Sequence, residues 1–461
     1  MALIGFMGAG KSTMADALAG RLGRSMIDVD RDIERGEAPI AELFVEWGEE
    51  KFRRVEAAHV HGYLESREVL VLALGGGAVT TPGVREHLGE TAFTVWIDVD
   101  VDTAWERVRG GNRPLAQDER QFRRLYAERR PLYQHVADAV AQDVDDAVLA
   151  AAGVNVGIGA IESLGTLVPG DGPIALVTDP HVAGIHGARA QLALGDRLVS
   201  THEVPAGEEA KTSSVVERLW SDLRVDRRGT IVALGGGCVT DVAGFAAATY
   251  LRGIPWVAVP TTLVGQVDAG IGGKTAIDLP EGKNLVGAFH WPVRTVIDPA
   301  LLETLPERER REGLAEVVKT GLLAGEPLWQ LPQPELVRRS ASFKAGVCLR
   351  DPYDRGERHI LNLGHTFAHA LEAAASYKGV THGTAVALGL RAALRLSGRP
   401  TDVVDELLAP KPVRVDRERA WRALGRDKKR GLVLLSDDGP KWDVQLPDED
   451  VRRALDELIA D

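Results

Sequence analysis

Cysteine is nearly absent from this sequence: Cys238 and Cys348 are the two among 461 residues. Two cysteines in so long a chain cannot form the disulfide framework of a secreted protein, so we expect a reducing, cytoplasmic location. The sequence also lacks an apolar run of membrane-span length, and we expect neither a membrane partner nor a signal peptide.

Positive charge is in deficit as well. Asp and Glu number 67 against 55 Lys and Arg, and the formal net charge is -12. Such a chain offers no bulk attraction for nucleic acid, so an anionic ligand would have to be held by local lysines and arginines. What the sequence has in quantity is glycine, with 50 residues gathered mainly in motifs. These clusters indicate tight turns and a close approach of the backbone to ligands.

The pattern of strands and helices predicts three modules. Strand and helix patterns alternate in the first third, which is typical of a parallel sheet covered by helices. An acidic stretch followed by small residues, at 140–172, separates it from a second set of strands, and from about residue 300 the period becomes helical. We predict strands at 24–30, 68–77, 92–100, 173–179, 229–241 and 254–262, and helices at 11–23 and 120–136. The fold class is therefore α/β, in three parts: 1–153, 154–300 and a mostly α-helical 301–461.

A phosphate-binding loop is predicted by "GFMGAGKS" at residues 5–12. The glycines let backbone amides turn toward phosphates, Lys11 reaches the terminal phosphates, and Ser12 can bind Mg²⁺. Four residues precede the loop, which is short for the strand that should carry it. The residues predicted to bind ATP on this loop are Gly8, Ala9, Gly10, Lys11, Ser12 and Thr13.

Charged residues downstream of the loop indicate the phosphate acceptor. Asp28 and Asp30 in "IDVD" would face one way on a strand. Arg53, Arg113 and Arg129 follow in "FRRVE", "NRPL" and "ERRPLY". Arginines for a carboxylate, a carboxylate for hydroxyls and a cation for the transferred phosphoryl group suit a kinase acting on a small carboxylated polyol.

These motifs, with "LGGGAVT" between them, give residues 1–150 a resemblance to shikimate kinase. The resemblance implies that Asp28 lies near Mg²⁺ and the reacting hydroxyl and that Arg113 is the lid arginine over ATP. It implies shikimate contacts from Asp30, Arg53, Gly76 and Arg129. The lid at 110–120 is short and the end of the module, "VAQDVDDAV", lacks the family's basic adenine-side segment. The alternative is therefore an impaired or regulatory nucleotide-binding half.

The last third contains a candidate metal site. Glu316 and Lys319 lie one helical turn apart, His365 and His369 share a helical face, and His382 precedes another helix. Arg358 and Asn362 would share the flank of the two histidines if that helix starts early enough. Spacing alone pairs His365 with His369 as metal ligands, so the ligand set stays open at this point.

Residues 154–461 resemble 3-dehydroquinate synthase. The motifs are "GEEAK", "GGGCVTDVAGF", "VPTT", "VDAGIGGKTAID", "GKNLVGAF", "GLAEVVKTG", the run from Arg358 to His369, and "HGTAVALG". The resemblance implies a Rossmann-like NAD-binding domain at 154–300, and Zn²⁺ or Co²⁺ bound by Glu316, His365 and His382, with His369 acting on substrate. Three departures stand out: Ala206 before "GEEAK", His181 where asparagine may serve in the family, and Thr384 where the family usually has Glu.

The same resemblance implies two sets of contacts. Those to NAD are Asp179, Glu208, Lys211, Gly237, Asp241, Thr261, Thr262, Lys274, Lys283 and Thr304. Those to the synthase substrate are Asp268, Lys274, Asn284, Lys319, Lys344, Arg358, Asn362, His369 and Lys428. The implied chemistry oxidises a secondary alcohol, eliminates phosphate and returns the hydride, so NAD is not consumed.

The sequence is thus interpreted as a bifunctional enzyme of the shikimate pathway. Its first half would phosphorylate shikimate with ATP and Mg²⁺, with Lys11, Asp28 and Arg113 as catalytic residues. Its second half would convert 3-deoxy-D-arabino-heptulosonate 7-phosphate to 3-dehydroquinate and phosphate. The catalytic residues implied there are Lys274, Lys319, Lys344, Arg358, Asn362 and His369. A plain NAD- and metal-dependent alcohol dehydrogenase is the rival for this half, and we expect a homodimer formed through it.

Overall fold

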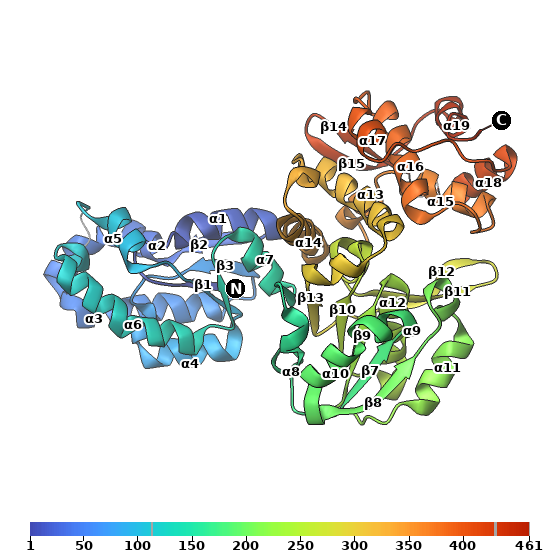
Figure 1. The fold of residues 1–461 in the computed structure, drawn as a ribbon. Coiled ribbons are helices and arrows are strands. Elements are labelled where there is room, and N and C mark those ends of the chain that lie inside the picture. Colours follow the sequence, from blue (N-terminus) through green and yellow to red (C-terminus); the bar gives the residue numbers. More distant parts are fainter. Residues whose placement is uncertain (112–113, 428–430, 461) are drawn as a thin grey trace. The chain divides into compact units, whose positions relative to one another are not determined.

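The structure is a computed structural model that describes residues 1–111, 114–427 and 431–460. The chain forms two compact units, Met1–Ala151 and Ala152–Asp461, which we describe separately (Figure 1). The first unit is an α/β domain. The second joins an α/β domain to a mostly helical one, and their boundary near residue 300 stays a prediction.

The first unit is built on a parallel sheet with strand order β2-β3-β1-β4-β5 and helices on both sides (Figure 1). Every residue of β1, β3 and β4 is buried, as expected of strands covered on both faces. The strands are β1 (Ala2–Ile4), β2 (Ser25–Asp28), β3 (Leu70–Ala73), β4 (Thr94–Ile97) and β5 (Ala139–Ala141). The helices are α1 (Lys11–Leu22), α2 (Val29–Gly36), α3 (Ile40–Leu64), α4 (Pro82–Thr91), α5 (Val101–Val108), α6 (Glu119–Val136) and α7 (Val144–Ala151).

Strands β1 and β2 both bear on predictions made from the sequence. The short β1 is three residues long, yet it lies at the centre of the sheet because it pairs with both β3 and β4. The prediction that Asp28 and Asp30 share a strand is wrong. Asp28 accepts a hydrogen bond from the backbone N–H of Arg31 and caps α2, so the strand ends there and Asp30 is helical.

The second unit begins with a six-stranded parallel sheet of order β6-β13-β10-β9-β7-β8. The connections after β7 and β9 run in opposite directions, which makes the carboxyl ends of these neighbours the place where such sheets bind ligands. The strands are β6 (Val154–Val156), β7 (Ile174–Thr178), β8 (Leu198–Glu203), β9 (Thr230–Gly235), β10 (Trp256–Pro260) and β13 (Arg294–Ile297). The helices are α8 (Leu164–Leu167), α9 (Pro180–Val182), α10 (Ala188–Leu194), α11 (Ser213–Asp222) and α12 (Gly237–Thr249). An antiparallel hairpin, β11 (Lys274–Leu279) and β12 (Gly282–Phe289), follows.

The rest of the second unit is mostly helical, as predicted. A second hairpin, β14 (Leu432–Ser436) and β15 (Gly439–Val444), interrupts it. The helix carrying His365 does not begin early enough to include Arg358. Gly364 adopts φ 79° and separates a 3₁₀ segment, Glu357–Asn362, from α15. The helices are α13 (Glu307–Ala324), α14 (Gln333–Arg350), α15 (His365–Ala374), α16 (His382–Leu396), α17 (Asp402–Leu407), α18 (Arg417–Asp427) and α19 (Asp448–Asp456).

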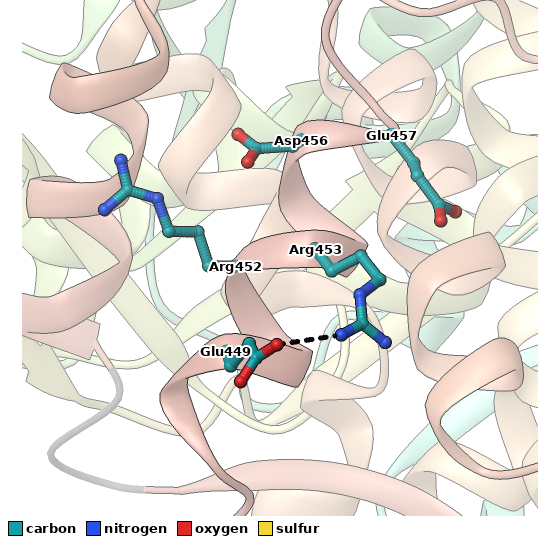
Figure 2. Close-up of a pocket in the computed structure, with 5 residues that line it drawn as sticks. All are labelled: Glu449, Arg452, Arg453, Asp456 and Glu457. Atoms are coloured by element: carbon teal, nitrogen blue, oxygen red, sulfur yellow. Dashed lines mark hydrogen bonds and ion pairs between the residues drawn. The ribbon is translucent and has the colours of Figure 1, made fainter.

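Two surface observations complete the fold. Within the described ranges, no helix is long and apolar enough to cross a membrane. A pocket of about 450 Å³ lies along α19 and is lined by Glu449, Arg452, Arg453, Asp456 and Glu457 (Figure 2). Its side chains are all charged, and Arg453 pairs with Glu449 at 3.2 Å, so we interpret it as a solvated helix face.

Candidate functional site

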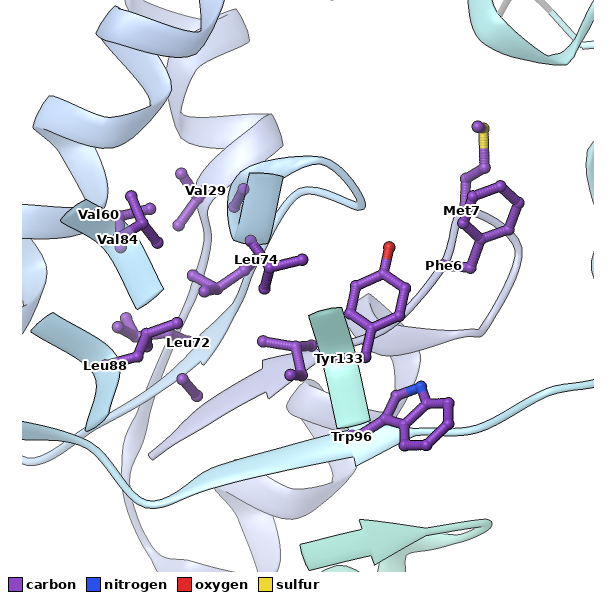
Figure 3. Close-up of a cluster of buried hydrophobic side chains, with 14 of the residues drawn as sticks. Phe6, Met7, Val29, Val60, Leu72, Leu74, Val84, Leu88, Trp96 and Tyr133 are labelled. Atoms are coloured by element: carbon purple, nitrogen blue, oxygen red, sulfur yellow. The ribbon is translucent and has the colours of Figure 1, made fainter. Parts of the chain in front are cut away.

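The loop after β1 rests on the core of the first unit. Phe6 and Met7 belong to the same buried cluster as Leu74, Trp96 and Tyr133 (Figure 3). The ring of Phe6 also packs edge-on against Phe122, with ring centroids 4.9 Å apart. These apolar contacts anchor the loop to the core of the first unit.

The backbone of this loop has the geometry of a phosphate-binding loop. Gly8 and Gly10 have φ of 85° and 88°, a region that favours glycine, and α1 begins at the next residue, Lys11. The Nζ atom of Lys11 donates to the carbonyl oxygens of Gly5 at 2.9 Å and Phe6 at 3.1 Å. The ammonium group of a lysine thus lies beside a helix N-terminus, an arrangement that favours the binding of phosphate. Six of the seven predicted ATP contacts, all except Arg113, lie on the loop and the first turn of α1: Gly8, Ala9, Gly10, Lys11, Ser12 and Thr13.

A glycine turn after β3 gathers the residues predicted to bind shikimate. A Cβ added to Gly77 would lie 2.1 Å from Nη2 of Arg53, and one added to Gly75 would lie 2.5 Å from Oδ1 of Asp30. Nη1 of Arg129 donates to the carbonyl oxygen of the middle glycine at 3.3 Å. Side chains in this turn would displace the charged groups that pack on it. The structure therefore brings together the four predicted residues: Asp30, Arg53, Gly76 and Arg129.

Glu56 belongs to this cluster, and the sequence analysis missed it. It is 1% exposed, its Oε2 pairs with Nη1 of Arg53 at 2.7 Å, and its Oε1 has no hydrogen-bond partner among the described residues. Burial raises the pKa of Glu56 despite the opposing effect of Arg53. Burial alone would lower the pKa of Arg53, but Glu56 and Glu49 outweigh it and raise that pKa. The three-residue spacing of Arg53 and Glu56 on one helix was the available signal.

Asp28 and Arg113 are the remaining predicted residues of the kinase half. Asp28 lies at the end of β2, where its carboxylate caps α2. Arg113 lies outside the described residues. A different arginine, Arg107, reaches the loop, because its Nη1 donates to the carbonyl oxygen of Gly8 at 3.1 Å. The sequence analysis did not consider Arg107, since nothing in its spacing links it to the loop.

In the second unit, three candidate metal ligands converge from three helices. Glu316 comes from the middle of α13, and His365 and His382 come from the first positions of α15 and α16. One potential ligand atom from each lies within 4.8 Å of the others. Nε2 of His365 and Nε2 of His382 each lie 3.4 Å from Oε1 of Glu316. One carboxylate and two imidazoles form a donor set that suits a divalent metal with an open position.

The protonation and burial of these groups fit a metal. Nδ1 of His365 lies 3.3 Å from the carbonyl oxygen of Leu363, and this contact favours the proton on Nδ1 and leaves Nε2 for a metal. Glu316 is 1% exposed and its Oε2 pairs with Nζ of Lys319, whereas its Oε1, which faces the two histidines, has no hydrogen-bond partner in the part of the chain that is described. His369 is exposed one turn after His365, with ring centroids 5.6 Å apart, and does not belong to the three-residue cluster.

A second carboxylate on α13 holds the start of α16. Oε1 of Glu312 accepts a hydrogen bond from the hydroxyl of Thr381 at 2.6 Å, and its Oε2 accepts one from the backbone N–H of Gly383 at 2.5 Å. Thr384, which replaces the usual glutamate of the resembling family, is bonded to the hydroxyl of Thr381 at 2.8 Å. Glu312 therefore anchors the turn that carries His382 to the helix that carries Glu316.

Lysines gather beside the candidate metal ligands. Lys319, 1% exposed, pairs with Glu316 and lies 3.5 Å from Oδ1 of Asp268. Nζ of Lys344 lies 2.7 Å from the same Oδ1. Burial alone would raise the pKa of Asp268, but Lys319 and Lys344 outweigh it and lower that pKa to about 2. Two buried ammonium groups thus face two carboxylates, those of Asp268 and Glu316, directly beside the candidate metal ligands.

Three other predicted substrate residues lie on β11 and on the 3₁₀ segment before α15. Arg358 is 1% exposed and donates from Nη2 to the carbonyl oxygen of Gly272 at 2.8 Å. Lys274 pairs with Asp354 at 2.6 Å, a partner that the sequence analysis did not identify. Asn362 ends the 3₁₀ segment just before α15. Lys428 lies outside the described residues.

Several residues predicted to contact NAD form a charged network that includes residues of β12. Nζ of Lys211, which is 3% exposed, lies 2.7 Å from Oδ2 of Asp241 and also donates to the side chain of Asn284. Lys283 pairs with Glu208 at 2.9 Å. Lys211, assigned to NAD, therefore contacts Asn284, assigned to substrate, so the two predicted sets adjoin.

The other predicted NAD residues lie at the carboxyl edge of the sheet or next to it. Asp179 follows β7 and caps α9 by accepting from the backbone of His181 at 2.9 Å and Val182 at 3.1 Å. Gly237 begins α12 after β9. The hydroxyl of Thr304 lies 3.0 Å from Nε2 of His186. Thr261 and Thr262 follow β10 directly. Because β7, β9 and β10 are neighbouring parallel strands, their carboxyl ends bring these distant parts of the sequence to one edge of the sheet.

Comparison with known proteins covers both units. A family model of shikimate kinase matches residues 7–153, and models of 3-dehydroquinate synthase, N-terminal and C-terminal, match residues 201–312 and 313–429. The bifunctional shikimate kinase/3-dehydroquinate synthase of Thermotoga maritima is 33% identical over 471 residues, covering 93% of this chain and 92% of that protein. The 3-dehydroquinate synthase of Bordetella pertussis is 40% identical over 341 residues, covering 66% of this chain and 95% of that protein.

Among solved structures, 2-deoxy-scyllo-inosose synthase complexed with carbaglucose-6-phosphate, NAD+ and Co²⁺ matches with a TM-score of 0.59 and 27% identity. The match covers 66% of this chain and 95% of that one. The two resemblances predicted from the sequence, and the predicted α/β fold class, are confirmed by these matches. With a relative that spans almost its whole length, this chain belongs to the family of bifunctional shikimate kinase/3-dehydroquinate synthases.

Proposed function

We propose that this chain catalyses two reactions at two separate sites. The first is ATP-dependent phosphorylation of shikimate to shikimate 3-phosphate. The second converts 3-deoxy-D-arabino-heptulosonate 7-phosphate to 3-dehydroquinate and phosphate, as a phosphate-eliminating lyase. The observation that carries the proposal is the joint presence of the glycine turn ringed by Arg53 and Arg129 and the Glu316–His365–His382 cluster beside buried lysines.

In the kinase half, the residues divide the work of phosphoryl transfer. Lys11 and the loop amides hold the nucleotide phosphates, and Ser12 contributes a ligand to Mg²⁺. Arg53 and Arg129 orient the carboxylate of shikimate, and Asp30 accepts from its hydroxyls. Glu56 keeps the guanidinium of Arg53 in place at 2.7 Å. These groups act by positioning, which is the main source of catalysis in phosphoryl transfer.

In the synthase half, the residues hold a phosphorylated acid. When bound, NAD+ supplies a hydride acceptor and the divalent metal, Zn²⁺ or Co²⁺, supplies a Lewis acid. Lys319, Lys344 and Arg358 offer cations to the phosphate and carboxylate, and Asp268 keeps the two lysines together. His369 is placed to carry a proton, because its ring adjoins the metal ligand His365 without joining the cluster.

The decisive experiment assays both reactions on the purified chain. ADP should form from ATP only with shikimate, and phosphate should be released from 3-deoxy-D-arabino-heptulosonate 7-phosphate only with NAD+ and a divalent metal. Absorbance at the NADH wavelength should stay flat while phosphate accumulates. Stoichiometric NADH would favour the dehydrogenase rival. Synthase activity without shikimate-dependent ADP would favour a regulatory role for the first half.

Location and assembly are part of the proposal. The two cysteines are free thiols, which supports a reducing cytoplasm. Leu285, Val286 and Phe289 expose apolar side chains on β12, which supports a homodimer formed through the synthase half. Light scattering on the purified chain would test the homodimer, and a monomer at all concentrations would contradict it.

A further inference from the structure

A buried carboxylate without an assigned role lies behind the candidate metal site. Glu372 is on α15, seven residues after His365, so the two side chains lie on the same face of the helix two turns apart. Glu372 is 4% exposed. Its Oε1 lies 3.6 Å from Nδ1 of His382 and 3.8 Å from Nζ of Lys283. A buried carboxylate needs such partners, and here an imidazole and an ammonium group from different elements face it.

His382 lies between two carboxylates. Its Nε2 faces Glu316 at 3.4 Å, and its Nδ1 faces Glu372 at 3.6 Å. The second contact is slightly longer than a hydrogen bond, so the carboxylate of Glu372 acts on the imidazole as a nearby negative charge. A negative charge on the Nδ1 side favours a proton on that atom, which leaves Nε2 for a metal. Carboxylates placed in this way orient metal-binding imidazoles and raise their basicity.

Lys283 lies between Glu372 and a residue of the predicted NAD site. Its Nζ pairs with Glu208 at 2.9 Å and lies 5.2 Å from the ring centroid of Tyr377. The backbone N–H of Tyr377 donates to the carbonyl oxygen of Glu372 at 2.8 Å. The chain of contacts Glu208–Lys283–Glu372–His382 therefore runs without a gap from the predicted NAD residues to a predicted metal ligand.

We propose that Glu372 is a positioning residue that orients His382 for the metal and, through Lys283, makes binding of NAD and binding of the metal strengthen each other. The inference rests on the proposed function of this site.

The direction of the effect follows from charge. Lys283 partly neutralises Glu372, because it lies 3.8 Å from the carboxylate. When an anionic group of NAD+ binds the ammonium group of Lys283, it offsets part of that positive charge. Lys283 then neutralises the carboxylate of Glu372 less, and Glu372 attracts the imidazole of His382 more strongly. Metal affinity should therefore rise when NAD+ is bound. By linkage, metal must raise the affinity for NAD+ by the same factor.

The test measures binding rather than turnover. The metal-free full chain is titrated with Zn²⁺ against a chromogenic chelator, with and without saturating NAD+, and NAD+ is titrated with and without Zn²⁺. The variants are Glu372→Gln, which removes the charge at nearly constant shape, and Glu372→Asp, which keeps it. Glu326→Gln is the matched control, because Glu326 pairs with Arg339 on the surface of the same unit. Circular dichroism and thermal unfolding of the metal-free variants establish that they are folded.

The expected result is a loss of Zn²⁺ affinity of about 10- to 100-fold in Glu372→Gln, the usual cost of removing the partner of a metal-binding histidine. In the wild type, bound NAD+ should raise the affinity for Zn²⁺ several-fold, and Zn²⁺ should raise the affinity for NAD+ by the same factor. In Glu372→Gln this factor should fall to about one. Glu372→Asp should recover part of both, and Glu326→Gln should change neither. A folded Glu372→Gln chain with wild-type Zn²⁺ affinity, or with unchanged enhancement, would overturn the inference alone. A wild-type chain that binds no stoichiometric Zn²⁺ would overturn the proposed metal site as well.

Discussion

Replacing Asp268 by asparagine removes the shared counter-ion of two buried lysines. Asp268 has Lys344 at 2.7 Å and Lys319 at 3.5 Å, and those lysines come from different helices, α14 and α13. The change keeps the size of the side chain and removes its charge. Because Lys319 is 1% exposed and Lys344 is 8% exposed, water cannot readily take the place of the carboxylate.

The size of the effect follows from the pKa of Asp268. Lys319 and Lys344 outweigh the effect of burial and lower that pKa from its ordinary 3.8 to about 2. At about 1.36 kcal/mol for each pH unit, the charged carboxylate stabilises the folded state by about 2 kcal/mol. Since the folded-state pKa is the lower one, this stabilisation is fully present above about pH 4 and is lost as the pH falls toward 2.

Hydrogen exchange followed by mass spectrometry localises this loss to one unit of the chain. In Asp268→Asn at pH 7, the slowest amides of α13 and α14 should exchange about 30-fold faster than in the wild type, the equivalent of about 2 kcal/mol. Urea unfolding of the second unit should show the same difference at pH 7 and a smaller one toward pH 3. Asp437→Asn is the control, because Asp437 is 95% exposed in its surface pair with Arg399, and we expect little change there.

Two results would refute this reasoning. An Asp268→Asn chain within about 0.5 kcal/mol of the wild type at pH 7 would mean that the carboxylate does not stabilise the cluster. A difference that stays constant from pH 7 to pH 3 would mean that the effect is one of packing and not of charge.

Three further predictions concern the sites. His365→Ala and His382→Ala should each lose bound metal by elemental analysis, whereas His369→Ala should keep it; metal loss only in His369→Ala would reverse the assignment. Lys11→Ala should cripple the kinase and leave the synthase near normal, and Lys274→Ala should do the opposite; a folded Lys11→Ala chain without synthase activity would show that the halves are coupled. Gly77→Ala should raise the KM for shikimate several-fold, because its Cβ would lie 2.1 Å from Arg53. Gly89→Ala is the control and should leave the KM unchanged, because its Cβ would have no described heavy atom within 4 Å beyond its own helix backbone and chain neighbours. An unchanged KM in Gly77→Ala would contradict the packing argument.

The sequence by itself determined those features that depend on neighbours along the chain. "GFMGAGKS" predicts its loop because glycines permit the left-handed backbone and the helix follows at once, and Gly8, Gly10 and Lys11 have that geometry. Alternating strands and helices predict the parallel sheets for the same reason, since their periods are local. Where a local rule was extended too far it failed: Asp28 ends its strand by capping α2, and Gly364 stops the helix that was to join Arg358 to His365.

Only the tertiary structure decided which distant groups meet. Periodicity ranks His369 beside His365, but the packing of α13, α15 and α16 places His382 there, 17 residues further along the chain than His365. Glu312 and Glu372 acquire their partners from other elements of the fold, and in isolation each is an ordinary glutamate on a helix. Glu372 shows the physical reason. A carboxylate removed from water needs partners, the fold supplies them from other elements, and spacing along one helix cannot say which groups those will be.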